Sequence, residues 1–597
     1  MKYPTVEIVP ESGQASPSPS ELDFPRFSFG LLPRFRCSVL LWLALPLFAE
    51  DSSSSSSSSG TSSAQSQAGW SGRTVVGIAL AAGTVGWGLA SSKDQFSASG
   101  LLPFVGSSQP IPGYNRPVKY ATLNEMESAL VEIRQELGGE DIISTDPEDL
   151  HAHGYSEWSS TNPEGLPVAV AYPRSTEQVS AIARICFKYN IPIIPYSGGS
   201  SLEGNFSAPY GGISIDFAFM DQILRFNKED MDIVVQPSIG WQDLNEKLAD
   251  LESGLFFPID PGPSAKIGGM IGTNCSGTNA VRYGTMKDWV INLTVVLSDG
   301  TVVKTRRRPR KSSAGYNLNS LFVGSEGTLG IVTEATLKLT VVPEDFSVAV
   351  VTFPSIRDAA AAASEVMRNG IPVAAMEIMD EVQMKVVNMG GATAPRVWQE
   401  LPTLFFKFSG TKAGVKENIS LVQKITKNNR GGNFEFAKDA REQKLLWSAR
   451  KESLWSMLAL RKDGEEVWST DVAVPFSRLP DLIEVSKKEM DDMGLFASIL
   501  GHIGDGNFHE SIIYNRTIPE EREKVEKCVK NMVKRAIEME GTCTGEHAIG
   551  WGKKESLLLE VGPDTLDVMK SIKLALDPKW IMNPGKIMDI PEGSTTI

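Results

Sequence analysis

The first regular alternation of hydrophobic and polar residues begins near residue 167. Residues 168–172 (VAVAY) predict a β-strand, and Ser175 and Gln178 follow at the spacing of a capping box that starts a helix. The residues after them predict an amphipathic helix packed on a sheet, and residues 191–195 (IPIIP) predict the next strand. The helix prediction rests on apolar residues that recur on one helix face: Val179, Ile182, Ala183, Cys186 and Phe187.

Strands and helices also alternate in the second half of the chain. Residues 347–353 and 403–408 predict strands, and residues 356–369 predict a helix between them, a pattern typical of an α+β sheet. A later apolar helix, around residues 446–455, carries Arg450 among Leu and Trp residues. No acidic residue lies three or four positions from Arg450 on this helix. The residues alone leave open whether Arg450 binds a carboxylate or is solvated on a helix surface.

Residues 1–73 differ in composition from the rest of the chain. They are rich in Pro and Ser, and the unbroken serine tract at residues 52–59 is typical of a linker. Residues 74–92 carry no charge, and a helix of this length spans about 28 Å, close to the hydrocarbon thickness of a bilayer. We therefore expect a single transmembrane helix at residues 74–92. A buried helix is the alternative, although no surrounding domain is predicted that would bury it.

A leader followed by one weak membrane span suggests a two-part mitochondrial targeting signal. The acidic residues Glu7, Glu11, Glu21 and Asp23 depart from that pattern, and the apolar run at residues 37–49 is also typical of a secretory signal. The five cysteines are scattered without a Cys-x-x-Cys pair, which weighs against secretion, a disulfide framework and a zinc ribbon. We expect a mitochondrial location, with residues 93–162 forming a linker and a helical lead-in.

Length and charge narrow the possible classes further. A chain of 597 residues is too long for one hydrophobic core, so several units are expected. The net charge of −14 argues against nucleic acid as a partner and is compatible with docking a basic protein.

Glycine-rich segments occur at three places: residues 196–205, 261–284 and 322–332. In the first, Gly198 and Gly199 permit positive φ, so successive backbone N–H groups there can form a concave site for an anion. A tight turn is the alternative. Small residues in the second segment let the backbone pass close to a flat or polyanionic ligand. No Gly-x-Gly-x-x-Gly follows a strand and opens a helix, so a Rossmann NAD site is not indicated.

Three of the five histidines lie near the C-terminus, at His502, His509 and His547. Asp505-Gly506 is a strong signal for a two-residue type I′ hairpin loop. In that register His502 and His509 face each other with Cβ atoms roughly 5 Å apart, which suits two ligands of one metal ion. Glu546 is a candidate third ligand and His547 a candidate base. The alternative is a loop whose histidines only form hydrogen bonds.

Several motifs in this order resemble FAD-binding proteins of the vanillyl-alcohol-oxidase/p-cresol-methylhydroxylase (PCMH) type. They are PRSTEQV from residue 173, SGGSS from 197, GGMIGTN from 268 and GSEGTLGIV from 324. The motifs HIGDGNFH, GEHAIG and LDPKWIMNPGK in the last hundred residues are similar to the D-2-hydroxyacid dehydrogenase branch, and within it to the fungal mitochondrial cytochrome-linked D-lactate dehydrogenases. The resemblance does not reach the N-terminal region.

The resemblance implies an α+β architecture of two subdomains. Residues 163–343 would form the FAD-binding PCMH-type domain, residues 344–560 a cap with an antiparallel sheet for substrate and metal, and residues 561–597 a segment that returns to the FAD domain. Members with covalent FAD carry His where this chain has Ser200, so non-covalent FAD is expected. By motif position the implied FAD contacts are Ser197, Gly198, Gly199, Ser200, Ser201, Gly204, Asn205, Pro261, Gly269, Gly272, Thr273, Ser276, Gly277, Gly327, Ile331 and Asn583.

The resemblance also implies a reaction, the oxidation of D-lactate to pyruvate. His547 would take the hydroxyl proton while a hydride passes from Cα to flavin N5, and Arg450 would fix the carboxylate. A divalent ion, Zn²⁺ or Mn²⁺, on His502, His509 and Glu546 would polarise the substrate. Electrons are expected to pass to cytochrome c, with the protein on the mitochondrial inner membrane and its catalytic part in the intermembrane space.

Substrate size is predicted from residues 467–475 (VWSTDVAVP). In the related D-2-hydroxyglutarate branch a lysine here meets the second carboxylate, whereas this chain has Ser469 or Thr470 in its place. Trp468 is expected to make the pocket smaller, and Lys462 is a nearby cation if its loop folds inward. We expect D-lactate to be preferred. The alternatives are D-2-hydroxyglutarate or another D-2-hydroxyacid and, outside the family, a metal-dependent hydrolase or a non-catalytic membrane-anchored binding protein.

Overall fold

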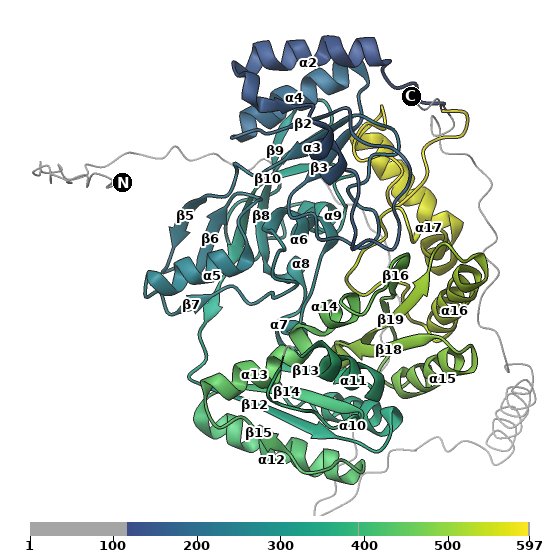
Figure 1. Cartoon of the computed structure of the whole chain (residues 1–597). Helices are drawn as coiled ribbons and strands as arrows, with labels where there is room; N and C mark the ends of the chain where they lie inside the picture. The colour runs from purple at the N-terminus through teal and green to yellow at the C-terminus, as the bar shows by residue number, and fades with distance from the viewer. Residues whose placement is uncertain (1–115, 392, 595–597) are drawn as a thin grey trace, which may run out of the picture. The chain divides into compact units, whose positions relative to one another are not determined.

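The computed structural model describes residues 116–391 and 393–594, which belong to one compact unit, Ser99–Ile597 (Figure 1). The membrane helix predicted at residues 74–92 lies outside the described residues. Within the described ranges, no helix is long and apolar enough to cross a membrane.

The first sheet has the strand order β1-β2-β4-β3 and is parallel except at β1. Helices α2 (Leu123–Leu137) and α4 (Thr176–Tyr189) pack against each other beside it (Figure 1). The other elements of this part are η2 (Glu140–Ile142), β1 (Ile143–Ser144), α3 (Pro147–Ala152), β2 (Ala169–Ala171), β3 (Ile193–Tyr196) and β4 (Ile213–Asp216).

The strand–helix–strand pattern predicted from residue 168 onwards is confirmed by β2, α4 and β3. Ser175 is the N-cap of α4, and its Oγ accepts the Gln178 N–H at 3.3 Å. The second half of the predicted capping box is wrong, because Gln178 Oε1 accepts the N–H of Arg174 at 2.6 Å instead of that of Ser175. The Gln178 side chain therefore also holds the residue that precedes the N-cap of α4.

The second sheet is antiparallel, with the order β5-β6-β10-β8-β9. Its core lies between these strands and short helices that carry the second and third glycine-rich segments. The elements are β5 (Ile223–Asn227), β6 (Asp232–Val235), α5 (Trp241–Asp250), β7 (Leu255–Phe256), α6 (Ile267–Thr273), α7 (Ala280–Tyr283), α8 (Met286–Trp289), β8 (Val290–Val296), β9 (Val302–Lys304), α9 (Leu318–Phe322), β10 (Ile331–Lys338) and β11 (Thr340–Val341).

The third sheet is larger and also antiparallel, with the order β15-β12-β14-β13-β18-β19-β16 and β17 paired to β19. Its strands are β12 (Asp345–Thr352), β13 (Ala375–Met379), β14 (Thr403–Gly410), β15 (Glu435–Phe436), β16 (Glu465–Ser469), β17 (Val472–Ala473), β18 (Phe496–Gly501) and β19 (Asn507–Asn515). The predicted strands at 347–353 and 403–408 are confirmed as β12 and β14. We call residues 345–515 the cap.

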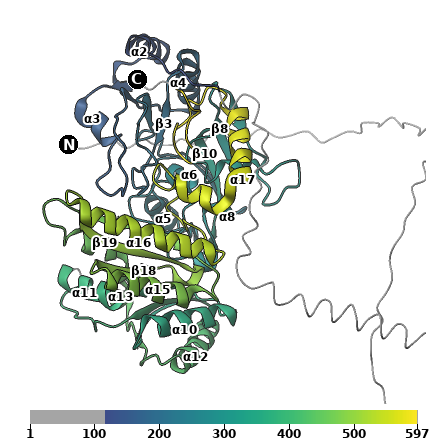
Figure 2. The same cartoon turned by 90° about the vertical axis from the view of Figure 1, so that its right-hand side faces the viewer.

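Both faces of the cap sheet are covered by helices. Alternate residues of β12 show this, because Ala349 and Val351 belong to one core cluster whereas Val348 and Val350 belong to another. The first face packs against α10 (Ile356–Arg368), α12 (Lys412–Asn428), α15 (Leu479–Asp492) and α16 (Pro519–Glu538) (Figure 2). The second packs against α11 (Glu381–Gly390) and α13 (Ala440–Lys451), and α14 (Ser453–Leu458) follows.

The C-terminal residues lie against the first sheet. After α17 (Lys554–Leu576), Ile581 accepts the N–H of Ile193 at 2.7 Å and Asn583 donates its N–H to Ile193 at 2.8 Å. The end of the chain thereby extends the edge at β3, directly before the first glycine-rich segment.

Candidate active site

A cavity of about 830 Å³ lies between the glycine-rich segments and the cap. Gly204 and Ser276 lie outside its lining, and their contact with FAD stays a prediction. Gly204 packs against Thr161, and Ser276 Oγ donates to Glu546 Oε2 at 2.5 Å. The other expected FAD contacts line the cavity: Ser197, Gly198, Gly199, Ser200, Ser201, Asn205, Pro261, Gly269, Gly272, Thr273, Gly277, Gly327, Ile331 and Asn583.

The glycine-rich walls fit a flat cofactor. A Cβ at Gly262 or Gly269 would meet no atom within 4 Å, so a side chain at either position would project into the cavity. Gly198 serves a different purpose, because a Cβ there would lie 3.1 Å from the backbone nitrogen of Lys266. The absence of side chains thus both keeps the cavity clear and brings two backbone segments together.

Glu326 connects the cavity walls, although the sequence analysis assigned it no role. It is buried, and its two carboxylate oxygens accept the N–H groups of Ile549 and Gly550 at 2.9 and 2.8 Å. The Asn205 side-chain amide also donates to it at 2.5 Å. Burial raises the pKa of Glu326 to about 7, although the N–H donors favour the ionised form and lower the pKa. Asn583 donates to the backbone oxygens of Asn205 and Glu326, so the C-terminal segment joins the same network.

The predicted hairpin register at the histidines is wrong. His509 pairs with Leu500, and the chain between β18 and β19 forms a 3-10 turn, η3 (Ile503–Asp505), in place of a two-residue loop. A type I′ loop needs positive φ at two positions, but only Gly506 has it here. Packing accounts for the longer turn, because Ile503 is fully buried and a Cβ on Gly504 would lie 2.6 Å from Val281.

The two histidines nevertheless meet. The register differs from the prediction by two residues, so His502 and His509 stay on one face of the ribbon as diagonal neighbours. Their ring centroids are 5.6 Å apart. Glu546 Oε1 lies 3.0 Å from His502 Nε2 and 3.6 Å from His509 Nε2. One ligand atom from each of these three residues lies within 4.8 Å of the others, which fits a divalent metal ion.

The hydrogen bonds of the other ring nitrogens define how these histidines point. His509 Nδ1 donates to the backbone oxygen of Thr470 at 2.9 Å, and His502 Nδ1 lies 2.9 Å from Glu377 Oε1. Both Nε2 atoms therefore face Glu546. Burial and the nearby His547 lower the pKa of His509 to about 3, which keeps this ring neutral. Burial opposes ionisation of Glu546, but the adjacent histidines hold its pKa well below the ordinary value.

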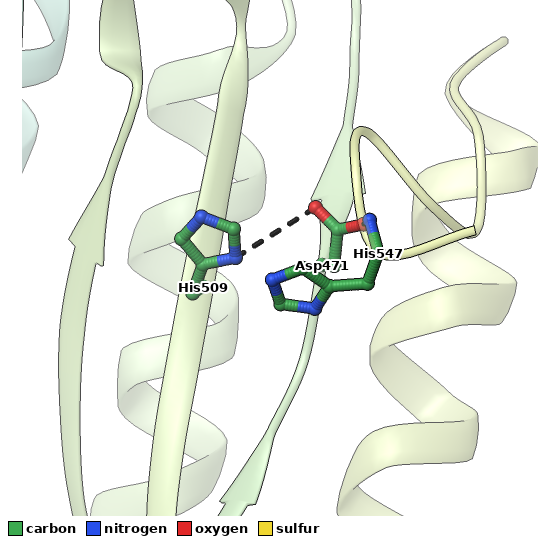
Figure 3. Close-up of side chains that lie close together, drawn as sticks. All are labelled: Asp471, His509 and His547. Carbon is green, nitrogen blue, oxygen red and sulfur yellow. Dashed lines mark hydrogen bonds and ion pairs between the residues drawn. The ribbon is translucent and has the colours of Figure 1, made fainter. Parts of the chain in front are cut away.

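His547 lies beside His509 (Figure 3). Its ring stacks on that of His509, with centroids 5.0 Å apart and planes 12° apart. It lines the cavity, and its Nδ1 is buried without a hydrogen-bond partner among the described residues. A histidine that lines the cavity and has an unpaired ring nitrogen is a candidate to accept a proton from a ligand there.

Asp471 lies close to His509 and His547 (Figure 3) and holds the loop that carries Glu546 and His547. Its Oδ2 accepts the backbone N–H groups of Gly545, Glu546 and His547 at 2.8, 2.9 and 2.8 Å, and the Thr544 hydroxyl at 2.7 Å. Burial alone would raise the pKa of Asp471, but His547, Lys553 and His509 hold it well below the ordinary value. The signal for this role in the sequence is an acid directly before the apolar run 472–475.

Asp471, His509 and His547 also lie close enough together to be tested as a second metal-ligand set. Their hydrogen bonds exclude it. Asp471 Oδ2 already accepts four donors and Oδ1 accepts the Asn507 amide, and His509 Nδ1 carries the hydrogen that it donates to Thr470. Asp471 therefore helps to position the His502–His509–Glu546 set through the backbone of Glu546.

Arg450 is buried at the cavity wall and has an acidic partner that its own helix does not supply. Its Nε donates to Glu377 Oε2 at 2.8 Å, and Glu377 lies on β13. The other oxygen of Glu377 meets His502 Nδ1, so one buried carboxylate links the arginine to the histidine set. The only signal for Glu377 in the sequence is an acid inside the apolar segment 374–379.

The expectation that Trp468 narrows the pocket is wrong. Ser469 lines the cavity, whereas Trp468 points to the opposite face of β16, packs against Tyr514 and is absent from the lining. Lys462 is exposed and also lies outside the lining. The cavity does contain other cations, Lys407 and Lys451, which the analysis of residues 467–475 did not consider.

The chain matches two family models: "FAD binding domain" over residues 167–306 and "FAD linked oxidases, C-terminal domain" over residues 342–587. The mitochondrial D-lactate dehydrogenase (cytochrome) of Kluyveromyces lactis is 49% identical over 488 residues, which are 79% of this chain and 83% of the relative. This chain belongs to the D-lactate dehydrogenase (cytochrome) family of FAD-linked oxidases. The mitochondrial D-lactate dehydrogenase (cytochrome) 1 of Saccharomyces cerevisiae is 48% identical over 492 residues, 81% of this chain and 82% of that relative.

More distant relatives place the family in a wider group. The mitochondrial D-2-hydroxyglutarate dehydrogenase of Bos taurus is 29% identical over 460 residues, 75% of this chain and 81% of the relative. The solved structure of p-cresol methylhydroxylase with substrate bound superposes with a TM-score of 0.64 at 20% identity, covering 79% of this chain and 99% of that one. The PCMH-type fold predicted from the motifs is thereby confirmed.

Proposed function

We propose that this protein oxidises D-lactate to pyruvate with FAD as its cofactor. The observation that carries the proposal is a single cavity in which the glycine-rich walls meet Arg450, His547 and the His502–His509–Glu546 set. The names of the relatives from Kluyveromyces lactis and Saccharomyces cerevisiae support the same substrate. A metal-dependent hydrolase would use the histidine set but would leave the glycine-rich walls without a purpose.

Arg450 orients the substrate through its carboxylate. Glu377 engages Nε, which holds the planar guanidinium in one orientation. The Nη groups remain for a ligand, because their one contact among the described residues is a 3.5 Å approach of Nη1 to Ser453 Oγ. A fixed guanidinium can bind both oxygens of a carboxylate, and burial strengthens that pairing.

His547 accepts the hydroxyl proton of the substrate. Its unpaired Nδ1, its place in the cavity and the firm hold of Asp471 on its backbone N–H suit that role. Bound FAD supplies the acceptor for the hydride that leaves Cα. Proton and hydride thus leave the substrate toward different groups on the cavity wall, which makes the orientation set by Arg450 necessary.

We also propose that His502, His509 and Glu546 hold a divalent metal ion, Zn²⁺ or Mn²⁺. Such an ion supplies Lewis-acid polarisation of the hydroxyl and carboxylate oxygens. His509→Ala should lose the ion and reduce turnover by about 100-fold or more while FAD stays bound, because the glycine-rich walls are separate from His509. His151→Ala, which changes an exposed histidine outside the cavity, is the matched control. Equal metal content in His509→Ala and the control would contradict the assignment.

Substrate preference separates this proposal from its nearest alternative, a D-2-hydroxyglutarate dehydrogenase. Ser469 is the cavity-lining residue of the stretch that carries a lysine in that branch, so no cation there meets a second carboxylate. We expect kcat/KM for D-lactate to exceed that for D-2-hydroxyglutarate by about 100-fold. Steady-state kinetics with both substrates and cytochrome c as acceptor measure this ratio, and equal values would exclude D-lactate as the preferred substrate.

Cytochrome c as electron acceptor and attachment to the inner membrane complete the proposal. The net charge of −14 suits a basic acceptor protein, and residues 74–92 have the length and composition of a single span that would leave the catalytic part in the intermembrane space. A truncated protein beginning near residue 105 should be active without detergent. If it still required detergent, the membrane contact would lie within the remaining chain.

A further inference from the structure

Lys407 is a cation on the cavity wall that the proposed reaction does not use. It lies on β14, where Phe406 and Phe408 point to the helix-covered core and Lys407 points to the opposite face. There it is partly buried and lines the cavity, with Nζ 3.9 Å from the centre of the Trp447 ring. The fold thus places a positive charge inside the same cavity as Arg450.

The charge of Lys407 is not neutralised by a direct partner. None of the described residues forms a hydrogen bond or ion pair with its Nζ, and its one close contact is the face of Trp447. Asp260 and Glu377 lie within electrostatic reach, but both are engaged elsewhere, Asp260 by Thr278 and Asn279 and Glu377 by Arg450 and His502. A buried ammonium group without a hydrogen-bond acceptor is costly unless a ligand supplies one.

Arg450 adds to this cost. Trp447 and Arg450 lie one turn apart on α13, and the charge of Arg450 acts on the Lys407 ammonium group, which lies over the Trp447 ring. Burial lowers the pKa of Lys407, and Arg450 and Lys451 lower it further, while Asp260 and Glu377 oppose the shift. Lys407 and Arg450 line the same cavity, and Glu377 pairs with Arg450 and His502 but not with Lys407. The arrangement favours an anion between them.

We propose that Lys407 is a second carboxylate-binding residue of the substrate site and acts together with Arg450 on the carboxylate of the 2-hydroxyacid. This inference rests on the proposed function and adds one residue to it. Arg450 supplies a planar fork of fixed direction, and Lys407 supplies a point charge held over Trp447. The two together bind a small monocarboxylate that offers few other contacts.

Titration of the FAD-loaded enzyme with pyruvate tests this role without turnover, because bound product perturbs the flavin absorbance. Lys407→Met should raise the Kd for pyruvate and the KM for D-lactate by about 10- to 100-fold, the loss expected for one charged hydrogen bond. The change in kcat should be much smaller, and Lys407→Arg should recover most of the affinity. Lys451→Met is the matched control, since it removes an exposed lysine from the same cavity.

Several outcomes would overturn the inference. Lys407→Met with wild-type affinity for pyruvate would show that the carboxylate does not meet Lys407. An equal loss of pyruvate affinity in Lys451→Met would show a general effect of positive charge in the cavity. If Lys407→Arg bound pyruvate as weakly as Lys407→Met, with normal FAD content, packing against Trp447 would be the important property of Lys407. Wild-type protein that bound no pyruvate and oxidised no D-2-hydroxyacid would overturn the proposed function as well, so the two failures are distinguishable.

Discussion

Asp471→Asn changes the residue that holds the loop 544–547 while keeping its size. The carboxylate accepts three backbone N–H groups and one hydroxyl through Oδ2, and it also accepts the side-chain amide of Asn507 at 2.8 Å. Asparagine has one neutral acceptor oxygen, and its NH₂ group would face either this set of donors or the amide of Asn507. The variant therefore weakens the hydrogen bonds that hold the backbone of Glu546 and His547.

The size of the effect follows from the number of donors. A hydrogen bond to a charged group contributes about 1.5–3 kcal/mol and a neutral one about 0.5–1.5 kcal/mol, so each of the four Oδ2 donors loses about 1 kcal/mol. A total of about 4 kcal/mol corresponds to nearly three orders of magnitude in the population of the ordered loop. We expect kcat/KM for D-lactate to fall by at least about 100-fold, since some of the loss is absorbed by relaxation of the loop.

The assay combines steady-state kinetics, metal analysis and FAD absorbance of the purified variant. FAD should remain bound, because Asp471 does not line the cavity, while metal content falls together with activity. Asp380→Asn is the matched control: it makes the same chemical change at a fully buried carboxylate outside the cavity and should keep wild-type activity. If Asp471→Asn kept wild-type turnover and metal content, the positioning role of Asp471 would be refuted.

Two further predictions concern the cofactor and the pH dependence of stability. Acid precipitation should release FAD into solution, since Ser200 stands where an imidazole would be needed for a covalent link, and flavin that stays with the precipitate would contradict this. Burial raises the pKa of Asp380 from 3.8 to about 7, so its contribution to stability is fully present below about pH 4 and is lost as the pH rises to about 7. Asp380→Asn keeps an oxygen that can cap α11 and does not ionise, so it avoids this loss. The free energy of unfolding of the variant, relative to wild type, should therefore be higher at pH 8 than at pH 5 by up to roughly 3 kcal/mol. Urea unfolding at both pH values measures this, and a difference between variant and wild type that did not change with pH would refute the assignment.

Local patterns were sufficient to predict the elements. The cap of α4 at Ser175 and the strands β12 and β14 follow from side chains within a few residues of each other, and such contacts are visible in sequence. The hairpin at Asp505-Gly506 was predicted by the same kind of reasoning and was wrong. There the decisive contact is between Gly504 and Val281, which are far apart in the chain.

In the candidate site, too, contacts between residues close in the chain were predictable and contacts between distant residues were not. His502, His509, Glu546 and His547 were predicted to cluster because their motifs lie close together in the chain. Glu377, by contrast, reaches His502 over 125 positions in the chain. Asp471 and Glu326 likewise act on segments distant in sequence, and buried carboxylates that accept backbone N–H groups have no short motif. Glu377 and Asp471 are visible in the sequence only as acids within or beside apolar residues, and Glu326 only as an acid in a glycine-rich segment.

We propose that one cavity joins bound FAD to the oxidation of a D-2-hydroxyacid. Anaerobic addition of D- and L-2-hydroxyacids to the purified flavoprotein, followed by the flavin absorbance, tests this most directly. D-lactate should bleach the flavin, whereas L-lactate should leave the spectrum unchanged. A protein that carries no flavin, or whose flavin is not bleached by any D-2-hydroxyacid, would contradict the account.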